Sequence, residues 1–202
     1  MSAIPNRRLT AEEFLAWERA SDTKHEYFDG DIIDFAGTSL DHARILQNIA
    51  GLFYNQLRGG NCQSFSTEIR VRVGKNRAYT YPDVVVICGE PQVADDQRDT
   101  VLNPTLIIEV LSPSTALIDR VKKFDLYTSI PTLQEYVLIH QDRPVSEQYV
   151  RQAIDKWLYT RINGLGNHLA LPSLGCTLAM TDIYERVVFA PEDSGEDDLN
   201  QP

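Results

Sequence analysis

The sequence predicts a single domain of mixed α/β structure. Two near-continuous apolar runs, Tyr79–Ile87 and Thr105–Leu111, are typical of strands buried at the centre of a sheet. A segment with apolar residues at helical spacing, Ser39–Arg58, precedes them, and several strand-like segments follow toward the C-terminus. The 202 residues suit one domain with its own core, and neither a linker nor an internal repeat divides the sequence.

Local signals predict four elements before the first central strand. They are a helix from Thr10 to about Ala20, a hairpin within His25–Ala36, a helix over Ser39–Arg58 and a strand over Ser64–Val73. The first helix begins with a capping box, in which Glu13 follows Thr10 by three residues. The hairpin is indicated by Asp29-Gly30, which is typical of tight turns. The fourth segment alternates apolar and polar residues, as a half-buried strand does.

The second half of the sequence predicts one helix followed by a meander of strands. The expected elements are a helix over Ala116–Ser129, strands over Glu135–His140, Glu147–Gln152, Lys156–Ile162 and His168–Leu171, and a short final helix within Leu178–Val187. Pro131 closes the first of these helices, because the residue before a proline disfavours helical geometry. The strands after Pro131 are separated by short segments, so we expect them to be antiparallel neighbours joined by short turns.

The net charge of the sequence argues against one class of function. The net charge of −10 argues against a general nucleic-acid binder, which usually presents a basic face. Any contact with DNA is therefore expected to be local, or to be made with metal bound. Residues 191–202 hold five acidic and no basic side chains, which predicts a disordered tail after a domain that spans residues 1–190.

The sequence also predicts a cytoplasmic protein that does not contact a membrane. The first residues contain no apolar stretch of the length found in a signal peptide, and no apolar run approaches the roughly 20 residues of a membrane span. The cysteines, Cys62, Cys88 and Cys176, are far apart and form no Cys-x-x-Cys pair. We expect three reduced thiols that fill the core, with neither a zinc site nor a disulfide.

Two acidic residues interrupt the central apolar runs. Asp83 follows Pro82 within the first run, and Glu109 lies inside the second. A carboxylate in an apolar strand is costly unless a partner compensates its charge. Were the two strands neighbours, both carboxylates would converge, and carboxylate oxygens are the ligands that Mg²⁺ prefers. The pair therefore predicts a divalent-metal site for phosphodiester chemistry.

A lysine on the following helix completes this candidate site. Lys123 and Tyr127 are four residues apart, so they share one face of the helix expected over Ala116–Ser129. A helix that directly follows the strand of Glu109 packs back on the same sheet, which brings Lys123 within reach. A lysine there can orient or deprotonate the attacking water, and it can offset negative charge in the transition state.

Structural roles remain open for each of these residues. Asp83 after Pro82 is also typical of a turn that hydrogen-bonds the backbone. Glu109 has the weaker structural alternative, because a buried glutamate is rare without a partner. Lys123 also suits a solvated helix position, and Tyr127 also suits packing in the core.

Three further residues are candidates for accessory roles. His42 is either a site residue or a first-turn residue of its helix. Ser112 opens a segment that predicts a helix start with an N-cap, and a helix N-terminus also favours phosphate. Arg120 either contacts phosphate or pairs with a neighbouring aspartate, Asp119 or Asp125, at the surface.

Taken together, the motifs resemble those of a known superfamily. Their order and spacing are similar to PD-x(n)-E-x-K, the signature of the restriction-endonuclease-like PD-(D/E)XK nucleases. In more detail, the chain resembles the Uma-type restriction endonucleases, long carried as a domain of unknown function and expanded in cyanobacteria. The resemblance runs from about Leu9 to Val187. The matching segments are His25–Gly30, His42, Tyr81–Val86, Ile108–Ser114, Lys123–Tyr127 and Pro131 with Glu135–Leu138.

The resemblance implies a restriction-endonuclease-like core, with a central mixed sheet flanked by helices and extra antiparallel strands toward the C-terminus. It implies that Asp83 and Glu109 are ligands of Mg²⁺ (or Mn²⁺), with Glu26 as the candidate third carboxylate. The sequence departs from the signature two residues after Glu109, where Leu111 stands in place of lysine. In the family pattern this lysine lies on the next helix, four residues before a tyrosine. Lys123, four residues before Tyr127, matches that position.

Lys122 is the neighbouring alternative for the catalytic lysine, although it points about 100° away on a helix. The resemblance implies a metal-dependent DNA endonuclease, and by analogy a homodimer. The alternative is a nuclease-fold module that binds DNA or protein with little activity. The acidic net charge favours this alternative, and the complete set of carboxylates opposes it. RNA or a smaller phosphodiester is a third option for the substrate.

Overall fold

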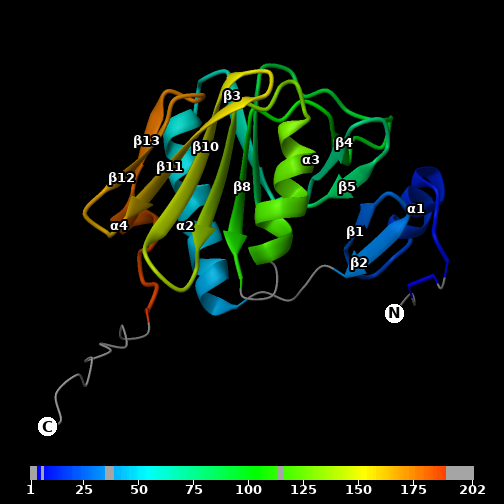
Figure 1. Cartoon of the computed structure of the whole chain (residues 1–202), viewed down its shortest axis with the longest axis horizontal. Coiled ribbons are helices and arrows are strands. Elements are labelled where there is room, and N and C mark those ends of the chain that lie inside the picture. Colours follow the sequence, from blue (N-terminus) through cyan, green and yellow to red (C-terminus); the bar gives the residue numbers. More distant parts are fainter. Residues whose placement is uncertain (1–3, 6, 35–38, 113–115, 190–202) are drawn as a thin grey trace, which may run out of the picture.

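The computed structural model describes residues 4–5, 7–34, 39–112 and 116–189. These residues form a six-stranded sheet, a five-stranded sheet and a two-stranded sheet, accompanied by a few helices (Figure 1). The chain therefore adopts the mixed α/β class that its apolar runs predict.

The six-stranded sheet carries the two central runs. Its strands, in spatial order, are β11 (Lys156–Asn163), β10 (Val145–Ala153), β9 (Glu135–His140), β8 (Leu106–Leu111), β6 (Val84–Cys88) and β3 (Cys62–Ser66). Strands β8 and β9 are parallel, and the other pairs are antiparallel. The sheet is thus mixed, with β8 and its glutamate near the centre.

Helices cover both faces of this sheet. On one face lie α2 (Leu40–Leu57), α4 (Met180–Ile183) and the hairpin of β12 (His168–Leu171) and β13 (Cys176–Ala179); on the other lie the π-helix η1 (Ile118–Lys123) and α3 (Phe124–Thr128). Figure 1 shows α2 and α3 on opposite sides of the strands. Strand β6 sends Val84 and Val86 into the core with α2, and Val85 and Ile87 into the core with α3. This alternation explains why the run is apolar throughout.

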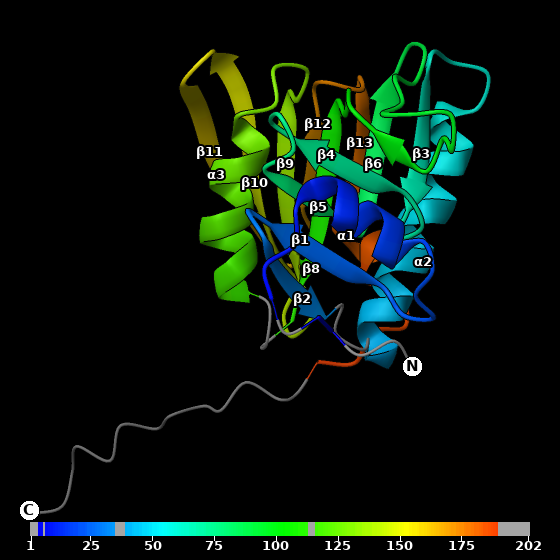
Figure 2. The ribbon, with the colours of Figure 1, turned by 90° about the vertical axis from the view of Figure 1, so that its right-hand side faces the viewer.

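The five-stranded sheet lies beside the first one, on the side of α3. Its strands, in spatial order, are β2 (Asp31–Asp34), β1 (His25–Phe28), β5 (Ala78–Thr80), β4 (Arg70–Val73) and β7 (Thr100–Val101). Figure 2 shows this sheet in front of the six-stranded sheet, with α1 (Ala11–Glu18) beside it. The capping box at Thr10 starts α1 as predicted. Phe14 packs against Tyr27 and Tyr79, which attaches the helix to this sheet.

Two predicted strands are each divided between the two sheets. The segment Ser64–Val73 forms β3 in one sheet and β4 in the other, and the run Tyr79–Ile87 forms β5 and β6. The chain crosses between the sheets at Thr67–Ile69 and at Tyr81–Asp83, and the Thr67 amide donates to the Asp83 carbonyl at 3.2 Å. The prediction of two continuous strands was wrong, because the apolar pattern of each segment continues through its crossing and does not mark the break.

Two helix predictions also need correction in detail. The helix expected over Ala116–Ser129 contains a six-residue π-helical segment, η1, before α3. The final helix expected within Leu178–Val187 is shorter, because its first residues belong to β13 and α4 ends at Ile183. The predicted acidic tail and the residues after Ser112 that would cap the helix, 113–115, lie outside the described residues.

The cysteines differ from their prediction. Cys62 on β3 lies directly opposite Cys88 on β6, and their sulfur atoms form a disulfide, while Cys176 is a free thiol. The expectation of three reduced thiols was therefore wrong. The bond depends on strand register between residues that are 26 positions apart, and no local motif reveals that register.

Thiol titration of the purified protein tests this pairing. Without reductant, the denatured chain should show one reactive thiol, from Cys176, and after reduction it should show all three. A Cys62→Ser variant serves as the control, since it should release Cys88 and show two thiols without reductant. Three thiols in the untreated wild type would contradict the disulfide.

No helix within the described ranges is both long and apolar enough to cross a membrane.

Candidate active site

Asp83 and Glu109 meet where the chain enters the six-stranded sheet. The antiparallel register of β6 and β8 pairs Val84 with Ile108, so the next position places Asp83 opposite Glu109. The Asp83 amide donates to Glu109 Oε2 at 3.3 Å, and the Val110 amide donates to Asp83 Oδ2 at 2.7 Å. Both carboxylates are buried. The expected convergence of these two side chains is thus what the strand pairing produces.

The Lys123 ammonium lies among three carboxylates from three different elements. Its Nζ is 3.1 Å from Glu26 Oε1 on β1, 3.1 Å from Glu109 Oε1 on β8 and 3.3 Å from Asp119 Oδ1 on η1. All four side chains are buried. The π-helical turn places Lys123 and Asp119 on the same inward face. Such turns occur frequently at functional sites.

Glu26 joins the five-stranded sheet to this cluster. Its Oε1 accepts a hydrogen bond from the Tyr81 amide at 3.0 Å, in the segment where the chain leaves β5. The resemblance implied Glu26 as a third carboxylate, and the structure brings it to Lys123. The site therefore lies between the two sheets, with ligand candidates from both.

Asp119 is a site carboxylate that sequence reasoning missed. It was considered only as a surface partner of Arg120, whereas its side chain is buried, with 2% exposure. Its Oδ1 accepts no hydrogen bond from the described residues, although Lys123 Nζ lies 3.3 Å away. The spacing of Asp119 four residues before Lys123 was the available signal, because such pairs share a helix face.

Tyr127 completes the contacts of Glu109. Its hydroxyl lies 2.9 Å from Glu109 Oε1, to which it donates, and 2.9 Å from Thr80 Oγ1. Burial and the negative charge of Glu109 raise the pKa of Tyr127 well above 10.0, so the phenol stays neutral. Tyr127 therefore packs in the core and also contacts Glu109.

Replacing Tyr127 by phenylalanine should lower the free energy of unfolding by about 1–3 kcal/mol, because Glu109 Oε1 loses a buried donor. Urea denaturation measures this change. Tyr54→Phe is the matched control, since Tyr54 is 66% exposed and the same substitution should change stability by less than about 0.5 kcal/mol. Equal stability of the two variants would contradict the hydrogen bond to Glu109.

His42 reaches the site from the opposite face of the sheet. It lies in the first turn of α2, where its amide donates to the capping Ser39 hydroxyl at 3.1 Å. Its Nε2 lies 3.2 Å from Asp83 Oδ2. His42 is therefore a first-turn residue of α2 whose side chain also contacts Asp83.

The remaining candidates lie outside the carboxylate cluster. Lys122 Nζ lies 3.9 Å from the centre of the Phe28 ring, so Lys123 is the lysine among the carboxylates. Arg120 binds Glu147, with Nη2 2.7 Å from Oε1, rather than either aspartate considered for it. Ser112 follows β8 directly, and its carbonyl accepts from the Ala116 amide at 3.0 Å.

Negative charge dominates the electrostatics of the site. Burial raises the pKa of Glu109 well above 4.5, and the nearby charges of Asp119, Asp83 and Glu26 add to this effect against the opposing Lys123. Burial also disfavours the charge on Lys123, but the surrounding carboxylates outweigh it and raise the pKa of Lys123 well above 10.5. The lysine is therefore a protonated ammonium at neutral pH.

The donor set fits a hard divalent cation. Mg²⁺ in phosphate-processing sites usually takes one or two carboxylates, together with waters and substrate phosphate. Asp83 and Glu109 supply two adjoining carboxylates of this kind. Within the described ranges, no three His, Cys, Asp or Glu side chains form a ready metal cage.

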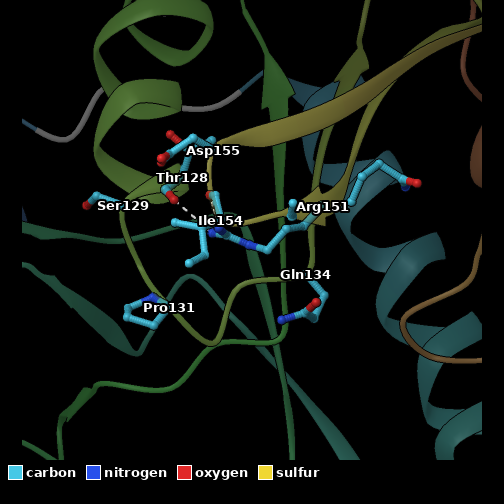
Figure 3. A pocket seen from close by; sticks show the side chains of 9 residues that line it. Thr128, Ser129, Pro131, Gln134, Arg151, Ile154 and Asp155 are labelled. Carbon is cyan, nitrogen blue, oxygen red and sulfur yellow. Dashed lines mark hydrogen bonds between the residues drawn. The ribbon is translucent and has the colours of Figure 1, made fainter.

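A separate hollow of about 510 Å³ lies at the other end of α3 (Figure 3). It is lined by Thr128, Ser129, Pro131, Gln134, Arg151, Gln152, Ala153, Ile154 and Asp155. Arg151 donates to the carbonyls of Thr128, Ile130, Leu133 and Ile154 over 2.6–2.9 Å. Arg151 therefore caps the end of α3 and joins it to the β10–β11 hairpin, which is a structural role.

Comparison with a solved structure supports the fold. The fold matches a crystal structure from Anabaena variabilis described as a putative nuclease belonging to DUF820, with a TM-score of 0.72. The match covers 89% of this chain and 99% of that chain at 21% sequence identity. The chain thus has a nuclease-like fold of the restriction-endonuclease type, as the resemblance implied.

Sequence comparison gives the family. The chain belongs to the Uma2 family, described as "Putative restriction endonuclease", whose match spans residues 11–181. Two similar proteins come from Synechocystis sp. and are described as uncharacterized. One, slr1290, is 36% identical and aligns over 93% of this chain and 97% of its own length. The other, sll1609, is 38% identical over 81% of this chain and 93% of its own length.

Proposed function

We propose that this protein is a metal-dependent endodeoxyribonuclease that hydrolyses phosphodiester bonds. The observation that carries the proposal is the meeting of Asp83, Glu109 and Lys123 between the two sheets. Two adjoining carboxylates beside a protonated lysine suit a reaction in which negative charge grows on a phosphate. Membership of a family described as putative restriction endonucleases supports the same reaction.

Asp83 and Glu109 would hold the ion, Mg²⁺ or Mn²⁺. When bound, such an ion polarises a phosphoryl oxygen and lowers the pKa of a bound water, which makes a better nucleophile. The backbone amides of Asp83 and Val110 orient the two carboxylates, so little rearrangement is needed to present them. His42 contacts Asp83, and Tyr127 contacts Glu109, so both would orient these ligands.

Lys123 would act as a charged group rather than as a base. An ammonium with a raised pKa has no lone pair with which to take a proton from water at neutral pH. It would instead offset the negative charge of the transition state and orient the attacking water by donating hydrogen bonds. Glu26 would keep Lys123 in place or serve as a further ligand, since its Oε1 lies 3.1 Å from Nζ.

DNA would bind through local contacts, because the chain carries a net charge of −10. A bound cation would reduce the repulsion between the site and the phosphate backbone. We further propose a homodimer, since two copies can address both strands of a duplex. We also propose a cytoplasmic location, where the Cys62–Cys88 disulfide would be an exception to the usual reduced state of thiols.

Plasmid cleavage with Mg²⁺ or Mn²⁺ tests the proposal, with Asp83→Ala and Lys123→Ala run beside the wild type. We expect metal-dependent nicking that both variants lose. Loss in Asp83→Ala alone would keep the metal site and remove the role given to Lys123. Cleavage that persists in Asp83→Ala would contradict the assignment of the site.

A binding module with the same fold is the second candidate, favoured by the acidic net charge. Thermal melting separates the two, because an ion that binds only the folded state raises stability by mass action. The nuclease should melt at higher temperature in millimolar Mg²⁺ or Mn²⁺. An unchanged melting temperature, together with no cleavage of duplex or single-stranded DNA, would favour the binding module.

A further inference from the structure

Aromatic side chains form a row at the outer end of the six-stranded sheet, on the face that carries η1 and α3. Tyr136 on β9, Tyr149 on β10 and Tyr159 on β11 lie directly opposite one another in the strand register. The ring centres of Tyr136 and Tyr149 are 6.3 Å apart, and those of Tyr149 and Tyr159 are 5.2 Å apart. Tyr136 is fully buried, whereas Tyr159 is 48% exposed. The row therefore leads from the core to the surface.

Packing in the core explains only the inner part of this row. Tyr149 packs against Phe124 of α3, with ring centres 4.6 Å apart. Tyr159 lies on β11, which ends the sheet and is found at its left edge in Figure 2. The half-buried Trp157, two residues before Tyr159 on the same strand, shares its face. Tyr159 and Trp157, called the aromatic edge below, therefore offer flat apolar rings to a partner outside the fold.

An arginine borders the aromatic edge. Arg161 follows Tyr159 by two residues, so it shares the same face of β11, and it is exposed. The carboxylate opposite Arg161 in the register is that of Glu147, which is buried and already binds Arg120, with Nη2 2.7 Å from Oε1. The charge of Arg161 is therefore available to an anion. In a chain with a net charge of −10, a cation beside aromatic rings is a local place where a phosphate can bind.

Strand register connects the aromatic edge with the candidate active site. Glu109 on β8, Leu138 on β9, Glu147 on β10 and Arg161 on β11 form one row across the sheet. Because neighbouring strands are 4.7–4.9 Å apart, Arg161 lies about 14 Å from Glu109 along this row. Arg120 of η1 lies over the row through its contact with Glu147, and its side chain is 31% exposed. A few nucleotides are enough to span this distance.

We propose that the aromatic edge and Arg161 bind a single-stranded segment of DNA, with a base stacked on Tyr159 and a phosphate held by Arg161. Aromatic rings beside basic side chains hold unpaired nucleic acids in this way, because every base has a flat face that can stack. A base inside a duplex is already covered on both faces. The inference deepens the proposed function by naming unpaired DNA as its substrate class, and it rests on that proposal for the choice of DNA as the polymer.

Fluorescence anisotropy of a labelled oligothymidylate tests the proposal. The titrations contain EDTA, so that no strand is cleaved. The variants are Tyr159→Ala and Arg161→Ala, and urea denaturation checks that both remain folded. Tyr54→Ala is the matched control, since Tyr54 is 66% exposed and lies on α2, on the opposite face of the sheet. The other probes are an abasic strand and a duplex, each of the same length.

We expect the wild type to bind the oligothymidylate more tightly than the duplex or the abasic strand. Tyr159→Ala should weaken binding of the oligothymidylate about 5- to 150-fold, the loss expected for one stacked base, and leave binding of the abasic strand unchanged. Arg161→Ala should weaken binding of both strands and reduce the slope of log affinity against log salt by about 0.7. Tyr54→Ala should bind all three probes as the wild type does.

Several results would overturn the proposal. They are unchanged binding of the oligothymidylate by Tyr159→Ala, an equal loss in Tyr54→Ala, and a wild type that binds the duplex as tightly as the single strand. Sedimentation of the same variants tests the other occupant of this surface. A Tyr159→Ala protein that dissociates from dimer to monomer, with unchanged DNA binding, would assign the aromatic edge to contact between two copies of the chain.

Failure of this proposal and failure of the proposed function give different results. Weakened DNA binding by Tyr159→Ala, together with no cleavage by the wild type in Mg²⁺ or Mn²⁺, would keep the aromatic edge and remove the nuclease. Metal-dependent cleavage that needs Asp83, together with wild-type binding and cleavage by Tyr159→Ala, would keep the nuclease and remove the aromatic edge.

Discussion

Replacing Asp83 by asparagine is expected to abolish metal-dependent DNA cleavage while the fold survives. The asparagine carbonyl can still accept the hydrogen bond that Asp83 Oδ2 receives from the Val110 amide, so the local backbone should hold. The charge that would bind the ion is lost. The loss of activity should exceed the roughly 100-fold that removal of an outer partner of a metal site costs.

Rates of plasmid nicking measure the effect of Asp83→Asn, and urea denaturation shows whether the fold survives. Asp96→Asn is the matched control, since Asp96 is exposed and should tolerate the same change without loss of activity. Cleavage by Asp83→Asn at a rate near that of the wild type would remove Asp83 from the site.

Among the substitutions described here, Lys123→Met is expected to lower the free energy of unfolding the most. In metal-free buffer, the variant leaves Glu26, Glu109 and Asp119 buried without their common cation. Removal of one partner from a buried ion pair costs about 3–5 kcal/mol. At about 2–4 °C per kcal/mol for a chain of this size, the melting temperature should fall by about 6–20 °C.

Lys122→Met is the matched control for this change. Lys122 is the next residue along the same helix, but it is exposed and contacts the Phe28 ring instead of a carboxylate. Its loss should cost no more than the 1 kcal/mol or so of an exposed cation–π contact. Equal losses of stability in the two variants would show that the carboxylates do not depend on Lys123.

Asp83 and Glu109, at the centre of the candidate site, could be singled out from the sequence because they interrupt the apolar pattern of buried strands. Asp83 and Glu109 are charged residues inside apolar runs, and burial makes such residues rare without a purpose. Lys123 followed from its place on the next helix together with Tyr127. Glu26 came from the family resemblance alone, since a glutamate in a short hairpin strand has many structural explanations.

The parts that were missed depend on three-dimensional pairing. Asp119 resembles any polar residue of an exposed helix, and its spacing from Lys123 was the one sequence signal that it shares the buried face. Cys62 and Cys88 become partners through the register of β3 and β6. The strand breaks near Thr67 and Pro82 leave the apolar pattern intact on both sides. The periodicity of apolar residues indicates which face of a strand is buried. It does not indicate to which of the two sheets the strand belongs.

The placement of the site between two sheets has a consequence for folding. Glu26 lies near the start of the chain and Lys123 far along it, yet their side chains touch. Contacts between distant segments form slowly, because closing a long loop costs entropy before the contact can stabilise it. A chain that has not yet brought these two segments together therefore lacks the contact between Glu26 and Lys123. Any activity that depends on this contact would appear only after both segments have folded together.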